Sequence, residues 1–226
     1  RGLGDVYKRQ AFASYLIGMT PEQVSMLKVD KDGKATDADL LSGCTIAVDR
    51  YRDAVTRACA NARALGAAKG DRAALGIEAV NGTSDITATD DKDVNAQVDV
   101  SIVALTTDAD RRVTSAIADM AEPALTVVSD GGVTAPDLVK TKLELGDDYN
   151  MKKYASPAAV GEWYEQANAF EAYCIGKTAD EVAGMPLGEN AHGYTDAPAA
   201  EELKSTCTIS VTAFLNAIAK AAANAK

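Results

Sequence analysis

The 226-residue sequence contains one histidine, and its four cysteines include no pair at the CxxC spacing. Structural zinc sites draw their ligands from closely spaced cysteines and histidines, so the sequence excludes a site of that kind. No apolar run approaches the roughly 20 residues that a membrane-spanning helix needs. The GxSxG, Walker, dinucleotide-binding and HExxH motifs are also missing, which leaves no recognisable nucleophile–base set and no predicted catalytic residue.

Basic residues are fewer than acidic ones. The chain has 23 Lys and Arg against 33 Asp and Glu, a formal charge of −10, and the basic residues form no stripe. Nucleic acid and anionic membrane surfaces are therefore not expected as direct partners. With 47% hydrophobic residues the chain can bury a core, and its length favours one or two domains.

An internal repeat is the strongest pattern present. Cys44–Arg63 reads CTIAVDRYRDAVTRACANAR and Cys207–Lys226 reads CTISVTAFLNAIAKAAANAK, with nine of twenty positions identical. Upstream, AFASYLIGMTPEQV at Ala11–Val24 matches AFEAYCIGKTADEV at Ala169–Val182. The spacings, 158 and 163 residues, predict two copies of one unit of about 160 residues, of which only the second half of the first copy is present.

The repeat sets the predicted domains. Residues 1–10, RGLGDVYKRQ, resemble a translated sequencing adapter and are treated as non-native. Residues 11–70 are then the C-terminal, mainly helical half of a first repeat, and residues 71–226 a complete second repeat. Cys44 and Cys207 occupy equivalent positions, whereas Cys59 and Cys174 have no cysteine counterpart. No disulfide within one copy would therefore recur in the other.

The hydrophobic pattern predicts an α+β fold. Strands are expected at 75–80, 97–106, 113–118 and 125–128, with Val98, Val100, Ile102 and Ala104 sharing one strand face. Helices are expected at 11–16, at 46–68, from Ser156-Pro157 to Gly176, and at the C-terminus. Loops at Thr83–Asn95 and Gly188–Glu202 are predicted to lie on the surface, as is His192. Strands before helices, with hairpin connections, indicate a small antiparallel sheet with packed helices in a tandem repeat whose first copy is truncated.

Each copy carries a short polar segment ahead of its alanine-rich helix. The segments are Ser42-Gly43-Cys44-Thr45 and Ser205-Thr206-Cys207-Thr208. They resemble the Ser-Gly-Ala-Thr motif of the FMN-binding domain family of bacterial electron-transfer subunits, in which the threonine carries FMN as a phosphoester. The resemblance implies covalent FMN at Thr45 and Thr208, with the other six residues as the surrounding loops. Free N–H groups at a helix N-terminus would suit the phosphate.

This sequence departs from that motif at two positions. Cys44 replaces the alanine in the first segment, and Thr206 replaces the glycine that permits close approach in the second. A purely structural interpretation of both threonines also stands, because threonine commonly ends a strand or caps a helix.

A wider resemblance covers most of the native chain. TKLELGDDYNMKKYASP at Thr141–Pro157 and GEWYEQANAFEAYCIGKTADEV at Gly161–Val182 are similar to a family of uncharacterised exported lipoproteins of anaerobic Gram-positive bacteria. The resemblance implies an extracytosolic, cell-surface electron carrier anchored through an N-terminal lipid that this chain lacks. It would need a flavin transferase for maturation, and a redox partner protein or a small-molecule electron acceptor. The alternative is a non-enzymatic cell-surface repeat protein that binds a ligand without flavin.

Overall fold

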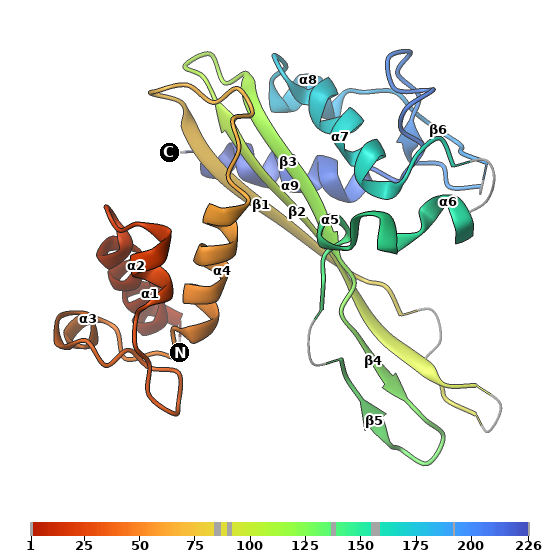
Figure 1. The fold of residues 1–226 in the computed structure, drawn as a ribbon. Helices are drawn as coiled ribbons and strands as arrows, with labels where there is room; N and C mark the ends of the chain where they lie inside the picture. Colours follow the sequence, from red (N-terminus) through yellow and green to blue (C-terminus); the bar gives the residue numbers. More distant parts are fainter. Residues whose placement is uncertain are drawn as a thin grey trace. The chain divides into compact units, whose positions relative to one another are not determined.

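A computed structural model describes residues 2–83, 87–89, 92–136, 139–154, 159–191 and 193–225. The chain divides into two compact units, Arg1–Ala64 (unit 1) and Leu65–Lys226 (unit 2). In Figure 1, unit 1 is the red and orange helical part, and unit 2 contains the sheet. His192 and the predicted helix start at Ser156-Pro157 lie outside the described residues.

The regular elements described in unit 1 are helices, with two isolated β-bridges in the loops between them. Its elements are α1 (Gly2–Leu16), α2 (Pro21–Ser25), α3 (Ala38–Gly43) and α4 (Asp49–Ala60). Helix α1 begins well before the predicted residue 11 and so includes most of the adapter-like segment. Helix α4 ends at Ala60 rather than near residue 68. It has no buried side chain, so no tertiary contact extends it further.

A small core holds unit 1 together. Phe12, Leu40, Cys44 and Val48 are at most 5% exposed and pack in one cluster. Thr20 begins α2 with a complete capping box: its side chain accepts from the Gln23 N–H, and its own N–H donates to the Gln23 side chain. Caps of this kind stabilise short helices that propensity alone would not form.

Unit 2 begins with an antiparallel sheet. Its strands are β1 (Arg72–Asn81), β2 (Val94–Thr107), β3 (Val113–Ala121), β4 (Ala124–Val127) and β5 (Val133–Thr134). Strand β1 pairs with the C-terminal part of β2 over its whole length, from Arg72 opposite Thr107 to Asn81 opposite Val98. Along its other edge β2 pairs first with β4 and then with β3. Hairpins connect these strands, which confirms the predicted α+β fold.

The face of β2 that carries Val98 and Ala104 is not the face that the sheet turns toward the core. Val103 and Leu105 are at most 3% exposed, whereas Val98 is 45% exposed and Ala104 is also exposed. The register places Gly76 opposite Val103, on the buried face. Gly76 is the one residue of β1 without a side chain, so a helix can approach the strand closely only on this face. Both faces of β2 are apolar, and the periodicity could not choose between them.

Helices and short strands complete unit 2. They are α5 (Lys142–Leu145), the 3-10 helix η1 (Gly146–Tyr149), α6 (Met151–Tyr154), α7 (Trp163–Cys174), α8 (Ala179–Ala183), β6 (Leu187–Gly188), β7 (Ala197–Pro198) and α9 (Thr212–Asn224). Helix α9 runs along β1 and β2, and α7 lies beside β3 (Figure 1). The Phe214 ring sits 6.1 Å from that of Trp163 and 5.9 Å from that of Phe170 at the centre of the core.

The outer edge of β3 is covered rather than open. The Val113 N–H donates to the Lys177 carbonyl at 2.8 Å, and Gly176 donates back to Val113 at 2.8 Å. Farther along, the Ala118 N–H donates to the buried Glu171 carboxylate at 2.8 Å. These contacts satisfy backbone groups that would otherwise template pairing with another chain.

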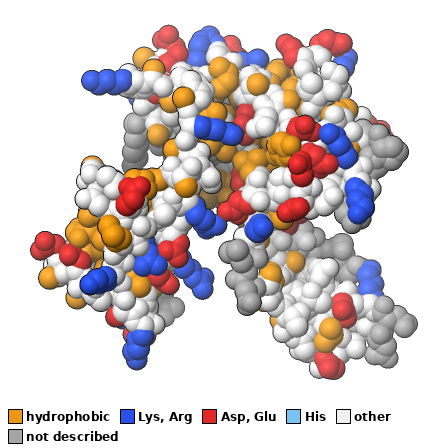
Figure 2. Space-filling view, viewed as in Figure 1, with side chains coloured by type: hydrophobic (Ala, Val, Ile, Leu, Met, Phe, Trp, Pro, Cys, Tyr) orange, Lys and Arg blue, Asp and Glu red, His pale blue; other side chains and the backbone are white. Residues whose placement is uncertain are grey.

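The predicted surface loop at Gly188–Glu202 is partly buried. Ala197 and Ala200 are 4% and 6% exposed, and β7 within this segment pairs with β6. Val94, at the end of the other predicted loop, is also buried and begins β2. Among the described residues, no helix is long and apolar enough to cross a bilayer. Figure 2 shows acidic and basic side chains interspersed over the visible face.

Candidate functional site

The first Ser-x-Cys-Thr segment forms the exit from α3. Ser42 and Gly43 are the last residues of that helix, and Cys44 is its fully buried C-cap. Thr45 follows in an exposed position, and none of the described residues bonds its hydroxyl. Helix α4 begins four residues later, at Asp49. Thr45 therefore does not occupy the helix N-terminus that the flavin resemblance implies.

The second segment has the same position relative to its helix. Ser205 and Thr206 belong to a run of turns, Cys207 is 1% exposed, and α9 begins at Thr212, four residues after Thr208. Thr206, which replaces the motif glycine, has its hydroxyl 3.4 Å from the Leu203 carbonyl.

The N–H and hydroxyl groups of Thr208 form hydrogen bonds with a buried side chain. The Thr208 N–H and hydroxyl donate to the Gln166 Oε1 atom at 2.8 Å and 3.1 Å. Gln166 is fully buried, and its Nε2 donates to the Gly161 carbonyl at 2.9 Å. The Thr208 carbonyl accepts from the Asn190 side chain at 2.9 Å. A phosphoester at Thr208 would remove the hydroxyl proton and with it the second of these bonds, at a cost of about 0.5–1.5 kcal/mol, while the N–H could still donate to Gln166 Oε1.

Burial also suppresses thiol chemistry beside this segment. All four cysteines are free, and Cys44, Cys174 and Cys207 are buried. Desolvation raises the pKa of Cys174 to about 12 and that of Cys207 to about 11. Only the thiolate is nucleophilic, so neither residue serves as a nucleophile near neutral pH.

These two thiols make unit 2 sensitive to alkaline pH. Their ordinary pKa of 9.0 applies in the unfolded chain, so their contribution to stability is complete below pH 9 and is lost as pH rises through the folded values. We expect the free energy of unfolding to fall by about 1.4 kcal/mol per pH unit for each thiol just above pH 9. Urea unfolding followed by Trp163 fluorescence measures this slope. Replacing either cysteine with alanine should remove that thiol's contribution to the slope of unfolding free energy against pH. An unchanged slope would contradict the raised pKa of the replaced thiol.

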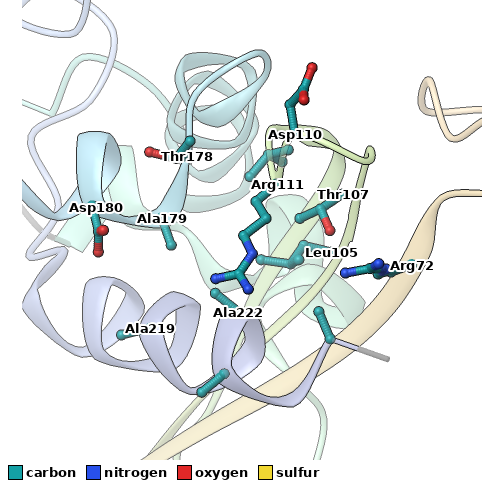
Figure 3. A pocket seen from close by; sticks show the side chains of 13 residues that line it. Arg72, Leu105, Thr107, Asp110, Arg111, Thr178, Ala179, Asp180, Ala219 and Ala222 are labelled. Atoms are coloured by element: carbon teal, nitrogen blue, oxygen red, sulfur yellow. The ribbon is translucent and has the colours of Figure 1, made fainter.

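A cavity of about 460 Å³ lies in unit 2 beside the C-terminal half of α9 (Figure 3). Strand β1, the β2–β3 turn, the start of α8 and α9 all contribute to its wall. The lining residues are Arg72, Leu105, Thr107, Asp110, Arg111, Val113, Thr178, Ala179, Asp180, Ala219, Ala222, Ala223 and Ala225. Its volume lies within the range of small-molecule sites.

Arg111 holds its place in the cavity through an unusual backbone. Its φ of 62° is in the left-handed region, which costs a residue with a Cβ about 1–2 kcal/mol. The turn imposes this geometry: the Arg111 N–H donates to the Asp108 carbonyl at 3.1 Å, and the Asp108 N–H donates to Arg112 at 3.0 Å. Figure 3 shows the Arg111 guanidinium directed toward Ala222 of α9, while Asp110 turns outward.

The strain at Arg111 can be tested directly. Because glycine adopts a positive φ without a Cβ clash, we expect Arg111→Gly to raise the free energy of unfolding of unit 2 by up to about 1 kcal/mol. Arg111→Ala removes the same guanidinium but keeps the Cβ, so it should give no such gain. Urea unfolding monitored by Trp163 compares the two, and equal effects would show that the backbone conformation is not strained.

The cavity combines positive charge with an apolar floor. The guanidinium groups of Arg72 and Arg111 have no hydrogen bond or ion pair within the described part of the chain, whereas that of neighbouring Arg112 bonds the Gly176 carbonyl and Glu181. Alanines of α9, together with Leu105 and Val113, form the apolar wall. The described residues include no cluster of three or more potential metal ligands. The arrangement can therefore bind an anion with an apolar body.

Sequence reasoning missed this site because its walls come from segments up to about 150 residues apart. The one available signal is the short connection between the strands predicted at 97–106 and 113–118, where Arg111 stands in a position that usually takes glycine. Comparison with known protein families, with curated proteins and with solved structures gave no match for this chain.

Proposed function

We propose that this protein is a non-enzymatic binding protein whose unit 2 cavity binds a small molecule carrying one carboxylate and an apolar body. One observation carries the proposal: the turn holds Arg111 in a strained conformation that puts an unpartnered guanidinium in the cavity. Strain of this size persists where the surrounding structure imposes it, and it is common at ligand sites.

The charges around the cavity favour a single negative charge over a phosphate. Two guanidinium groups suit a carboxylate, which arginine can bind through two parallel hydrogen bonds. However, Asp110 and Asp180 also line the cavity, and the C-terminal end of α9 carries the negative end of its helix dipole. A dianion would meet more repulsion there than a monoanion. The alanine wall then suits the uncharged part of the ligand.

Thermal unfolding followed by Trp163 fluorescence tests this proposal with hexanoate, phenylacetate and phenyl phosphate as probes. We expect the two carboxylates to raise the midpoint of unit 2, and phenyl phosphate to raise it less. Arg72→Gln and Arg111→Gln should each weaken binding at least tenfold, since hydrogen bonds to charged groups contribute about 1.5–3 kcal/mol.

Arg50→Gln is the matched control because Arg50 is an exposed arginine of unit 1, outside the cavity. It should leave binding unchanged. The proposal fails if no carboxylate stabilises unit 2, or if the Arg72 and Arg111 variants bind as well as the Arg50 variant.

A second candidate function is the extracytosolic electron carrier with covalent FMN, and the exposure of Thr45 favours it. The Thr45 hydroxyl is accessible and is bonded by none of the described residues, whereas Thr208 bonds Gln166. A transferase could reach Thr45 without breaking a bond. In this function the cofactor would supply the redox chemistry, and a redox partner or small acceptor would take the electrons.

Intact mass and peptide mapping after export and co-expression with a flavin transferase test the carrier. We expect one FMN on the Thr45 peptide, none on the Thr208 peptide, and none in Thr45→Ala. An unmodified Thr45 peptide, with the transferase active on a control substrate, would remove this candidate.

A further inference from the structure

Two backbone hydrogen bonds fix the turn that precedes helix α4. The Cys44 N–H donates to the Leu40 carbonyl at 2.8 Å, and the Val48 N–H donates to the Gly33 carbonyl at 2.7 Å. Val48 is the N-cap, with φ −121° and ψ −4°. This backbone arrangement sets the direction in which α4 leaves the unit 1 core.

Equivalent backbone hydrogen bonds fix the turn that precedes helix α9, 163 residues later in the chain. The Cys207 N–H donates to the Leu203 carbonyl at 2.8 Å, and the Val211 N–H donates to the Asp196 carbonyl at 3.1 Å. Val211 is the N-cap, with φ −117° and ψ −7°. Each residue therefore has its counterpart in the α4 junction, and the two helices begin from the same local geometry.

Helix α9 is seated on β1 and β2 by a defined set of side chains. Phe214, Ala217, Ile218 and Ala221 are at most 2% exposed. The contact is closest at Gly76 of β1, where an added Cβ would lie 1.8 Å from the Ala217 carbonyl oxygen. The two alanines thus pass directly over a strand glycine, and the larger side chains pack on either side.

Helix α4 carries the same set, and none of these side chains is buried by the described part of the chain. Tyr51, Ala54, Val55 and Ala58 stand 163 residues before those four side chains, and we call them the α4 face. Tyr51 is 46% exposed, the two alanines are exposed, and Val55 is half-buried. The Tyr51 ring has one aromatic neighbour in unit 1, Phe12, at 6.3 Å.

We propose that the α4 face is a docking surface for an antiparallel β-sheet with a glycine in its contacting strand, seated as β1 and β2 are seated on α9. The alanine pair selects such a sheet because a side chain in place of the glycine would hold the helix away. In unit 2 the sheet precedes α7, whose sequence matches the segment from Ala11. The occupant is therefore a sheet of the same kind as the β1–β2 sheet of unit 2.

Neither sheet face of a second copy fits this surface as well. The glycine-bearing face is already covered by that copy's own α9. Its opposite face carries Leu75 and Ile77, which are 52% and 45% exposed and too large to admit an alanine pair at close range. The proposal is independent of the cavity and of flavin, because it involves neither Arg111 nor Thr45.

The test supplies the sheet from this chain itself. Residues 65–168 are joined directly to Ala11 in place of residues 1–10, which restores the element order of unit 2 and keeps the rest of the chain intact. A Val55→Cys, Cys59→Ser background then reports on the α4 face through the rate of thiol alkylation, since the other three cysteines are buried. We expect alkylation of Cys at position 55 to slow at least tenfold in the extended chain relative to the chain without the insert.

The matched control is the same extended chain with Gly76→Val in the inserted copy only. It should restore fast alkylation, because valine blocks the close approach of α4. Equal rates with and without the insert, or equal protection by the valine insert, would overturn the proposal.

Amide hydrogen exchange reports whether the inserted strands are ordered. If the proposal is right, helices of unit 1 cover the inserted strands and slow their amide exchange. Inserted strands that exchange as fast as an unfolded chain would therefore also contradict it. Concentration-dependent protection of position 55 in the chain without the insert would instead assign the α4 face to a second copy.

Discussion

Replacing Gly76 with alanine should displace helix α9 from the sheet. The new Cβ would lie 1.8 Å from the Ala217 carbonyl oxygen and 2.7 Å from the Ala221 nitrogen, both backbone atoms that cannot rotate away. Helix α9 would have to shift as a body, which disturbs the packing of Phe214 against Trp163. We expect a loss of at least about 3 kcal/mol in the free energy of unfolding of unit 2, at the upper end for overpacked cores.

Trp163 makes this measurement specific to unit 2, because it is the single tryptophan and is 3% exposed. Gly184→Ala is the matched control: its added Cβ would lie 3.4 Å from the Asp180 carbonyl oxygen, an ordinary contact. That variant should change stability by less than about 1 kcal/mol. Similar losses in both variants would show that the α9–β1 contact tolerates a side chain.

We expect Gln166→Leu to destabilise unit 2 by about 2–4 kcal/mol. The substitution removes the acceptor of the Thr208 N–H and hydroxyl, and the donor to the Gly161 carbonyl. Leucine preserves the volume but leaves the backbone groups without these bonds in a dry environment, where each costs about 1–3 kcal/mol. Urea unfolding followed by Trp163 fluorescence gives the loss.

A Gln166→Glu variant separates hydrogen bonding from packing. Ionised glutamate can still accept from Thr208, but it cannot donate to the Gly161 carbonyl and it buries a charge. Burial raises the pKa of such a carboxyl, and the protonated form can donate again. The variant should therefore recover stability relative to Gln166→Leu as pH falls. Parallel pH profiles for the two variants would contradict the assigned bonds.

The Thr208 contact shows where motif reasoning reached its limit. The Ser-x-Cys-Thr pattern identified a junction that recurs before α4 and α9. It could not show that Gln166, 42 residues earlier, bonds the Thr208 hydroxyl while Thr45 stays exposed. That difference depends on which side chain of another helix is packed over the segment, and local sequence does not encode it.

Local pattern determined the elements of this protein by itself. Alternating apolar residues located the long strands, because alternation depends on neighbours in the chain. This feature is fixed by short-range sterics and hydrogen bonding.

Tertiary packing decided which surfaces these elements bury. Both faces of β2 are apolar, so only the approach of α9 over Gly76 selected the face of Val103 for the core. The cavity formed where α8, α9 and the β2–β3 turn meet, and the strain at Arg111 is visible only in the folded turn. Helix α4 shows the same dependence, because the side chains of the α4 face remain exposed or half-buried. Burial requires a partner in space, and periodicity along one chain segment does not supply one.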